Sequence, residues 1–121
     1  MDTEQIYKTI VAYKDGITTN INGSIPNLKG FGVSITDNKI SLEQFNNQQF
    51  INTFLKGLIT DIIEQDKPNL FIGSWFDNSN NSVCIDETLN ILDKAEALLY
   101  AKLFKQRAIY NFETNEVIEV L

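Results

Sequence analysis

The sequence predicts an α+β fold: an antiparallel sheet of about six strands with helices packed on it. Stretches with apolar residues at helical spacing alternate with short strand-like segments, and these segments come in pairs. The links within the pairs are short, which favours antiparallel neighbours. The predicted order is αββαββαββ, and 121 residues give room for a single domain, residues 1–121.

The first quarter of the chain predicts one helix and two strands. Residues 3–14 place Ile6 and Ile10 on one side of a helix. Residues 17–21 alternate apolar and polar side chains, and residues 30–35 form a second strand-like run. These three segments supply the first αββ unit of the predicted order.

The clearest helical pattern lies in the middle of the chain. Ser41 and Asn47 are both candidate start points, and the helix must end before Pro68. Gly57 interrupts the pattern, and we expect it to let the helix approach another element closely. Seven apolar residues at spacings of three and four form the predicted core side: Ile51, Phe54, Leu55, Leu58, Ile59, Ile62 and Ile63.

The second half of the chain predicts two hairpins separated by a helix. Residues 70–76 and 83–85 form the first hairpin, and residues 108–112 and 117–120 form the second. Residues 92–106 form the helix between them. Its predicted core side consists of Ala95, Leu99 and Leu103.

Charge and composition restrict the classes of function. Sixteen acidic and ten basic side chains give a net charge of −6, which repels phosphate backbones and disfavours direct nucleic-acid binding. The sequence contains neither a signal-like segment nor an apolar run of membrane-spanning length, and it therefore predicts a cytoplasmic location without a membrane partner. The single cysteine, Cys84, fits a reducing compartment and is interpreted as a small buried hydrophobic residue.

The second half of the chain contains a recognisable set of residues: Gly73, Trp75, Asp86, Ala95, Gln106, Ala108, Ile109, Tyr110, Thr114, Glu116 and Ile118. On these residues, residues 70–120, together with the segment 30–34, resemble a loose group of small, mostly uncharacterised bacterial and mobile-element proteins of phage or plasmid type. The resemblance implies a C-terminal half with strand-strand-helix-strand-strand order. It supplies no reaction and no catalytic residue. Asn115 stands where glycine is usual in that group.

The chain lacks histidine, which excludes the usual serine and cysteine triads, histidine acid–base catalysis and most zinc or copper sites. Asp77, Asp86 and Glu87 flank the first predicted hairpin and are the carboxylates with the best chance of forming a site. We interpret them as solvated turn and strand-end groups, because Ser82 and Thr88 stand where a calcium loop needs glycine and glutamate. No catalytic residue, cofactor or metal is predicted.

The predicted function is that of a non-catalytic, acidic protein-binding module whose partner has a basic surface. With the mobile-element resemblance, this favours an inhibitor of a nucleic-acid-handling partner, such as an anti-CRISPR or other anti-defence protein. Asp2 and Glu4 are candidates for extending the acidic surface. The predicted partner-binding residues are Trp75, Asp77, Glu113, Glu116 and Glu119.

Three alternatives stay open at this point. A toxin-immunity protein would have the same size and acidity. A small carboxylate-using enzyme or ligand-binding domain would use Asp77 and Asp86 with Tyr110 around a cleft. A homodimer would form through an exposed edge strand such as residues 117–121.

Overall fold

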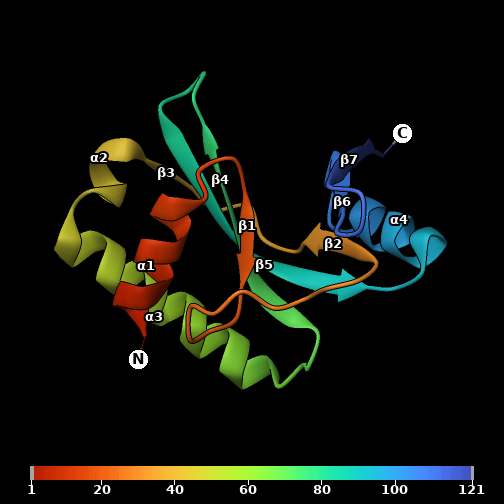
Figure 1. Cartoon of the computed structure of the whole chain (residues 1–121), viewed down its shortest axis with the longest axis horizontal. Helices are drawn as coiled ribbons and strands as arrows, with labels where there is room; N and C mark the ends of the chain where they lie inside the picture. Colours follow the sequence, from red (N-terminus) through yellow and green to blue (C-terminus); the bar gives the residue numbers. More distant parts are fainter. Residues whose placement is uncertain (1, 121) are drawn as a thin grey trace.

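The computed structural model describes residues 2–120 and has the α+β fold, with an antiparallel sheet and helices packed on it (Figure 1). Within these residues there are four helices and seven strands. The helices are α1 (Thr3–Ala12), α2 (Leu42–Phe45), α3 (Gln48–Gln65) and α4 (Lys94–Leu103). The strands are β1 (Ile17–Thr19), β2 (Phe31–Ser34), β3 (Lys39–Ser41), β4 (Leu70–Asp77), β5 (Ser82–Ile91), β6 (Ala108–Asn111) and β7 (Glu116–Glu119).

The strands follow the spatial order β1-β4-β5-β2-β6-β7, and all described pairs are antiparallel. The long β4–β5 hairpin forms the centre of the sheet. β3 also pairs with β5, on the same side as β2 but nearer the hairpin turn. β1 and β7 therefore stand at opposite ends of the sheet, with the C-terminal hairpin β6–β7 continuing it beyond β2.

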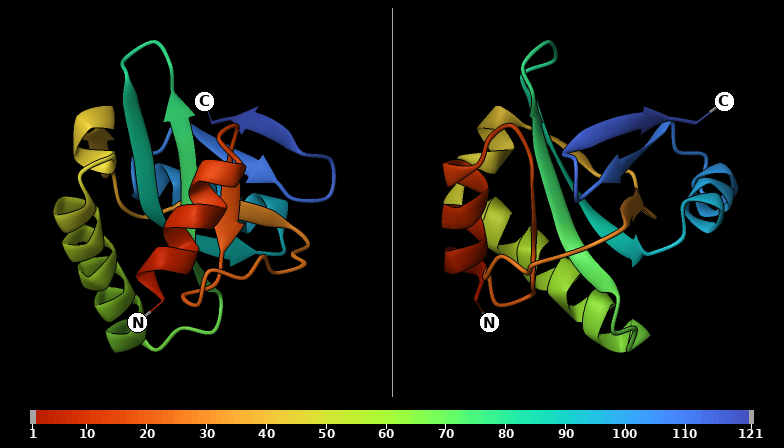
Figure 2. Two further views of the ribbon diagram at one scale, coloured as in Figure 1. Left: turned by 60° about the vertical axis from the view of Figure 1, so that its left-hand side comes forward. Right: turned by 45° about the vertical axis from the view of Figure 1, so that its right-hand side comes forward.

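The helices fall into two groups, which Figure 2 separates clearly. α3 packs on β5 at the centre of the sheet, and α1 packs on α3 and on the edge strand β1. α4 packs on β2, β5 and β6 at the other end of the molecule. The molecule thus has an N-terminal region, built by α1, α3 and the β4–β5 hairpin, and a C-terminal region, built by α4, β2, β6 and β7.

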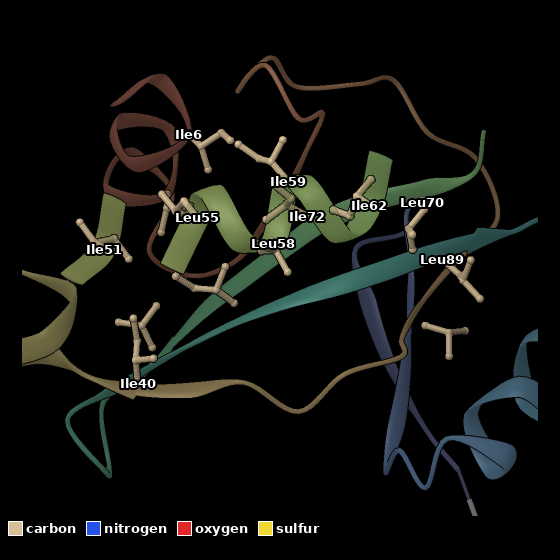
Figure 3. Close-up of a cluster of buried hydrophobic side chains, with 14 of the residues drawn as sticks. Ile6, Ile40, Ile51, Leu55, Leu58, Ile59, Ile62, Leu70, Ile72 and Leu89 are labelled. Carbon is tan, nitrogen blue, oxygen red and sulfur yellow. The ribbon is translucent and has the colours of Figure 1, made fainter. Parts of the chain in front are cut away.

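The main core lies between α3 and the sheet (Figure 3). Leu55 and Ile72 are both fully buried there, and Ile6 of α1 packs against the same cluster. The α3 residues that turn inward are Ile51, Leu55, Leu58, Ile59 and Ile62. This confirms most of the predicted core side, but Phe54 is only half-buried and Ile63 is 54% exposed.

Both predicted helix starts are real, because the segment contains two helices. Ser41 caps α2 with a capping box: its hydroxyl accepts from the Gln44 backbone N–H at 3.0 Å, and the Gln44 side chain accepts from the Ser41 N–H. The Asn47 side chain then caps α3 by accepting from the Phe50 backbone N–H at 3.1 Å. α3 ends at Asp66, whose φ of 49° is left-handed.

The sheet differs from the predicted one in three ways. It has seven strands instead of about six, because the short β3 was not predicted. β1 pairs with β4 and not with β2, so the first two strands are not neighbours. β5 continues to Ile91 instead of ending at Ile85, although its polar residues Asp86, Glu87 and Thr88 interrupt the apolar pattern.

The glycines show where the backbone is crowded and where it is open. A Cβ on Gly57 would meet nothing within 4 Å, so the expected close approach of the helix at this position is wrong. At Gly32, by contrast, a Cβ would lie 2.8 Å from the Phe112 ring, which covers this glycine. Asn115 adopts a φ of 58° in the β6–β7 turn, the left-handed conformation that asparagine tolerates in place of glycine.

The core side of α4 differs from the predicted one, which consisted of Ala95, Leu99 and Leu103. Its buried residues are Ala97 and Ala101, whereas Leu99 and Leu103 face solvent. The short alanine side chains let the helix lie close to β2. Leu98 is partly buried against the core, while Leu99 and Leu103 are left on the outer side. No helix formed by residues 2–120 is long and apolar enough to cross a membrane.

Candidate functional site

Asp86 lies where the strand beside β5 is interrupted. Ser34 of β2 is opposite Thr88, and Lys39 of β3 is opposite Cys84, so residues 35–38 contain one residue more than the β5 segment they face. The Asp86 carboxylate oxygen Oδ1 fills the break by accepting from the Asn38 backbone N–H at 2.7 Å and from the Thr36 hydroxyl at 2.9 Å.

The same hydroxyl, Thr36 Oγ1, accepts from the Glu87 backbone N–H at 3.1 Å. Asp86 is buried, and this burial raises the pKa of its carboxyl group to about 6, while the hydrogen bonds from Asn38 and Thr36 act in the opposite direction. The immediate role of Asp86 is therefore structural: it satisfies backbone and hydroxyl donors that the interrupted ladder leaves free.

Glu87 and Asp86 point to opposite faces of the sheet, because neighbouring strand residues alternate. Glu87 is buried, and its carboxylate accepts from the Gln65 side-chain amide at the end of α3. The two adjacent carboxylates therefore do not face a common ligand.

Asp77 organises the turn of the β4–β5 hairpin. Its oxygen Oδ1 accepts from the Ser79 hydroxyl at 2.6 Å and from the Ser79 N–H at 3.2 Å. Oδ2 accepts from the Asn80 side-chain amide at 2.8 Å and forms an ion pair with Lys39 at 3.3 Å. The hydrogen bonds from Ser79 and Asn80 are the main reason why the pKa of Asp77 is lowered to about 2. Asp77 thus serves the turn as an ionised acceptor.

Asp77, Asp86 and Glu87 do not converge. Asp77 is opposite Ser82, four residues along β5 from Asp86, which corresponds to about 13 Å. Among residues 2–120, no group of three or more acidic or cysteine side chains is placed to hold a metal ion. Two shallow hollows of about 330 and 400 Å³ lie beside α1, and neither is lined by these three carboxylates.

Cys84 is buried near the start of β5, as its interpretation as a small hydrophobic residue requires. Burial is the main cause that raises the pKa of its thiol, so the thiol is held in its protonated form.

The three glutamates of the C-terminal hairpin all face solvent, but they do not form one flat acidic face. Glu116 and Glu119 lie three residues apart on β7 and so point to opposite sides of the strand. Glu113 lies in the turn and accepts from the Gly30 backbone N–H at 3.3 Å. We call this hairpin, with Glu113, Glu116 and Glu119, the acidic hairpin.

Between the glutamates of β7 lies a large apolar side chain that the sequence analysis did not single out. Val117 is 68% exposed, and it stands opposite Tyr110, which is also exposed. The Tyr110 ring packs edge-on against Phe112 at 5.4 Å between centroids. β7 pairs only with β6 within the described residues, so its other edge is free. Neighbouring residues of a strand point to opposite faces, and Ile118 packs against the core. The sequence could therefore have indicated that its neighbour Val117 faces outward.

The remaining predicted partner residues lie elsewhere. Trp75 is 48% exposed on β4, opposite Cys84, and three strands separate β4 from β7. Asp2 and Glu4 belong to the α1 end of the molecule, which packs on β1 at the opposite end of the sheet. The structure therefore groups Glu113, Glu116 and Glu119 on one hairpin and places Trp75 and Asp77 together on another.

A second apolar surface runs along α4. Its outward side carries Ala95, Leu99 and Leu103, and Leu92 is exposed just before the helix begins; we call these four residues the α4 outer stripe. Leu92 is 74% exposed and Leu103 is 67% exposed, so most of each side chain faces solvent. Large leucines left in water along one helix mark a surface that another protein can cover.

No protein-family model matches the chain, and neither a curated protein nor a solved structure matches it.

Proposed function

We propose that this chain is a non-catalytic protein-binding module that engages a basic partner surface through the acidic hairpin. The observation that carries the proposal is Val117, a large apolar side chain that is 68% exposed on a free strand edge, between Glu116 and Glu119. Val117 forms an exposed apolar pair with Tyr110, which stands opposite it on β6. Such a pair beside charges suits a contact surface, because the apolar groups supply burial and the charges supply selectivity.

The free edge of β7 adds a geometric reason. A strand edge offers backbone donors and acceptors that an extended segment of a partner can pair with. Lysine or arginine side chains on such a segment would meet Glu116 on one side and Glu119 on the other. The partner chemistry that fits is therefore an extended, basic segment at the rim of a larger protein.

The more specific form of the proposal is an inhibitor of a nucleic-acid-handling enzyme, such as an anti-CRISPR or other anti-defence protein. Such enzymes carry basic surfaces because they must neutralise phosphates. A chain with a net charge of −6 competes for those surfaces with the nucleic acid itself. A toxin-immunity protein would use the same chemistry, and the neighbouring genes would distinguish the two.

A pull-down from host lysate with matched variants tests the proposal. The tagged wild type is compared with Glu116→Lys/Glu119→Lys and with Asp61→Lys/Glu64→Lys, whose side chains are exposed on α3. Both double variants change the net charge by the same amount. We expect a basic partner, identified by mass spectrometry, with the wild type and the α3 variant at low salt and not with the hairpin variant. Equal recovery with all three proteins contradicts the role of the hairpin.

A further inference from the structure

α4 packs Leu98 and Tyr100 against the core, but two of its leucines, Leu99 and Leu103, face away from it. Ala97 and Ala101 are fully buried, while Leu99 is 58% exposed. At about 100° per residue, Leu99 lies on the side of the helix opposite the two alanines. Leu103 follows Leu99 by four residues, so both belong to one continuous face, the α4 outer stripe.

The charges near this stripe differ from those of the rest of the protein. Asp93, Lys94 and Glu96 stand at the N-terminal end of α4, where acidic side chains outnumber basic ones, and Lys102 and Lys105 stand at its C-terminal end. The chain as a whole has a net charge of −6, so two copies repel each other over most of their surface. Charges of both signs lie around α4, so this repulsion is weaker there.

We infer that the α4 outer stripe is covered by α4 of a second copy, packed antiparallel around a two-fold axis near Leu99. In this arrangement Leu99 meets its symmetry mate. Ala95 and Leu103, each four residues from Leu99, meet each other across the axis, so a small side chain faces a large one. The acidic end of one helix then lies level with the basic end of the other. This inference goes beyond the proposed function and does not depend on it.

The free edge of β7 is a poorer surface for a second copy. Antiparallel pairing of β7 with itself, in the register that joins all four residues, sets Glu116 directly opposite Glu119 of the other copy. Like charges directly opposite each other destabilise a strand pair. The glutamates thus protect the edge from self-association and leave it to a basic partner.

The size of the stripe sets the expected strength of the dimer. A helix of ten residues is about 15 Å long, which is shorter than the span of a standard protein interface. The dimer is therefore expected to be weak: populated near millimolar concentration and dissociated at low micromolar concentration.

Sedimentation equilibrium over this concentration range tests the inference with four proteins: the wild type, Leu99→Lys, Val117→Lys and Ile63→Lys. All three replaced side chains are more than half exposed, and Ile63 lies on α3. Leu99→Lys removes two buried leucines from each dimer and weakens the association by about 100-fold. Val117→Lys and Ile63→Lys leave it unchanged.

Circular dichroism shows whether each variant is folded, and Leu103→Lys replaces Leu99→Lys if the latter fails to fold. A wild type that is monomeric at every concentration overturns the inference. So does a dimer that Val117→Lys dissociates as strongly as Leu99→Lys, because β7 would then be the interface.

A charge exchange tests the antiparallel alignment. Glu96→Lys alone places a lysine opposite Lys102 of the other copy, and the repulsion between like charges weakens the dimer by about fivefold. Adding Lys102→Glu to the same chain restores opposite charges across the axis without creating an ion pair within the helix, since the two positions are six residues apart. Recovery of the wild-type association supports the alignment, and a double variant as weak as the single one overturns it.

Discussion

The N-terminal and C-terminal regions use their helices in opposite ways. In the N-terminal region, α3 turns its large apolar residues, such as Leu55, into the core, where they are fully buried. In the C-terminal region, α4 buries two alanines and leaves Leu99 and Leu103 in water. The comparison teaches that apolar spacing identifies a face of a helix but not where that face points. The direction depends on how much space the sheet leaves beneath the helix.

The largest expected effect is on the stability of the N-terminal region. Leu55→Ala opens a cavity in the main core and lowers the free energy of unfolding by about 2–5 kcal/mol. Leu99→Ala changes it by less than about 0.5 kcal/mol, because the Leu99 side chain is mostly exposed to solvent in the monomer. Urea denaturation at low micromolar protein concentration measures both. Equal losses for the two variants would show that the contrast between the helices is wrong.

Asp86 lies between the two regions and makes their junction sensitive to pH. Its pKa is raised from 3.8 to about 6, so the folded state holds a proton that the unfolded state has released in that range. The protonated carboxyl group of Asp86 therefore stabilises the folded state fully below about pH 4. This stabilisation is lost as the pH rises through about 6, and the loss in the free energy of unfolding is about 3 kcal/mol.

Asp86→Asn replaces the carboxyl group by an amide that does not ionise. The stability of this variant should therefore not fall as the pH rises. Urea denaturation of both proteins between about pH 4 and pH 7 provides the measurement. A wild type whose stability rises steadily over this range, with no difference from the variant, contradicts the raised pKa.

The next effect concerns the space beneath α4. Ala97→Leu forces a large side chain between the helix and β2, and it should lower the free energy of unfolding by about 1–3 kcal/mol. Ala95→Leu, on the exposed side of the same helix, is the matched control and should change stability by less than about 0.5 kcal/mol. A tolerated leucine at position 97 would mean that α4 does not need alanine to reach the sheet.

The smallest expected effect is a gain of stability in α3. Gly57 lies inside the helix, and an added Cβ would meet no atom within 4 Å. Gly57→Ala should therefore stabilise the protein by about 1 kcal/mol through helix propensity alone. A rise in the thermal midpoint would confirm that α3 is open to solvent there, whereas a fall would reveal a close contact at this position.

Most of the fold could be predicted from the sequence because its signals are local. The period of α3, the caps at Ser41 and Asn47, and the two later hairpins each depend on residues near one another in the chain. β3 was not predicted, because a strand of three residues is too short to show the alternation of apolar and polar side chains. The full length of β5 was not predicted, because the partners that satisfy the buried Asp86, Thr36 and Asn38, lie about 50 residues away in the sequence.

The candidate site was harder to predict than the fold. Glu113, Glu116 and Glu119 could be named from the sequence, and the hairpin that holds them was predicted correctly. The exposure of Val117 and of the α4 leucines depends on which side of each element meets the sheet. That choice is made by strand order and packing, which a single sequence does not specify.

Isothermal titration of the purified partner across a range of salt concentrations tests the central claim most directly. The wild type is compared with Glu116→Lys/Glu119→Lys and with Asp61→Lys/Glu64→Lys. If the acidic hairpin is the binding surface, the hairpin variant loses about tenfold or more in affinity and shows a flatter salt dependence, while the α3 variant behaves like the wild type. A hairpin variant with unchanged affinity and unchanged salt dependence would contradict the account.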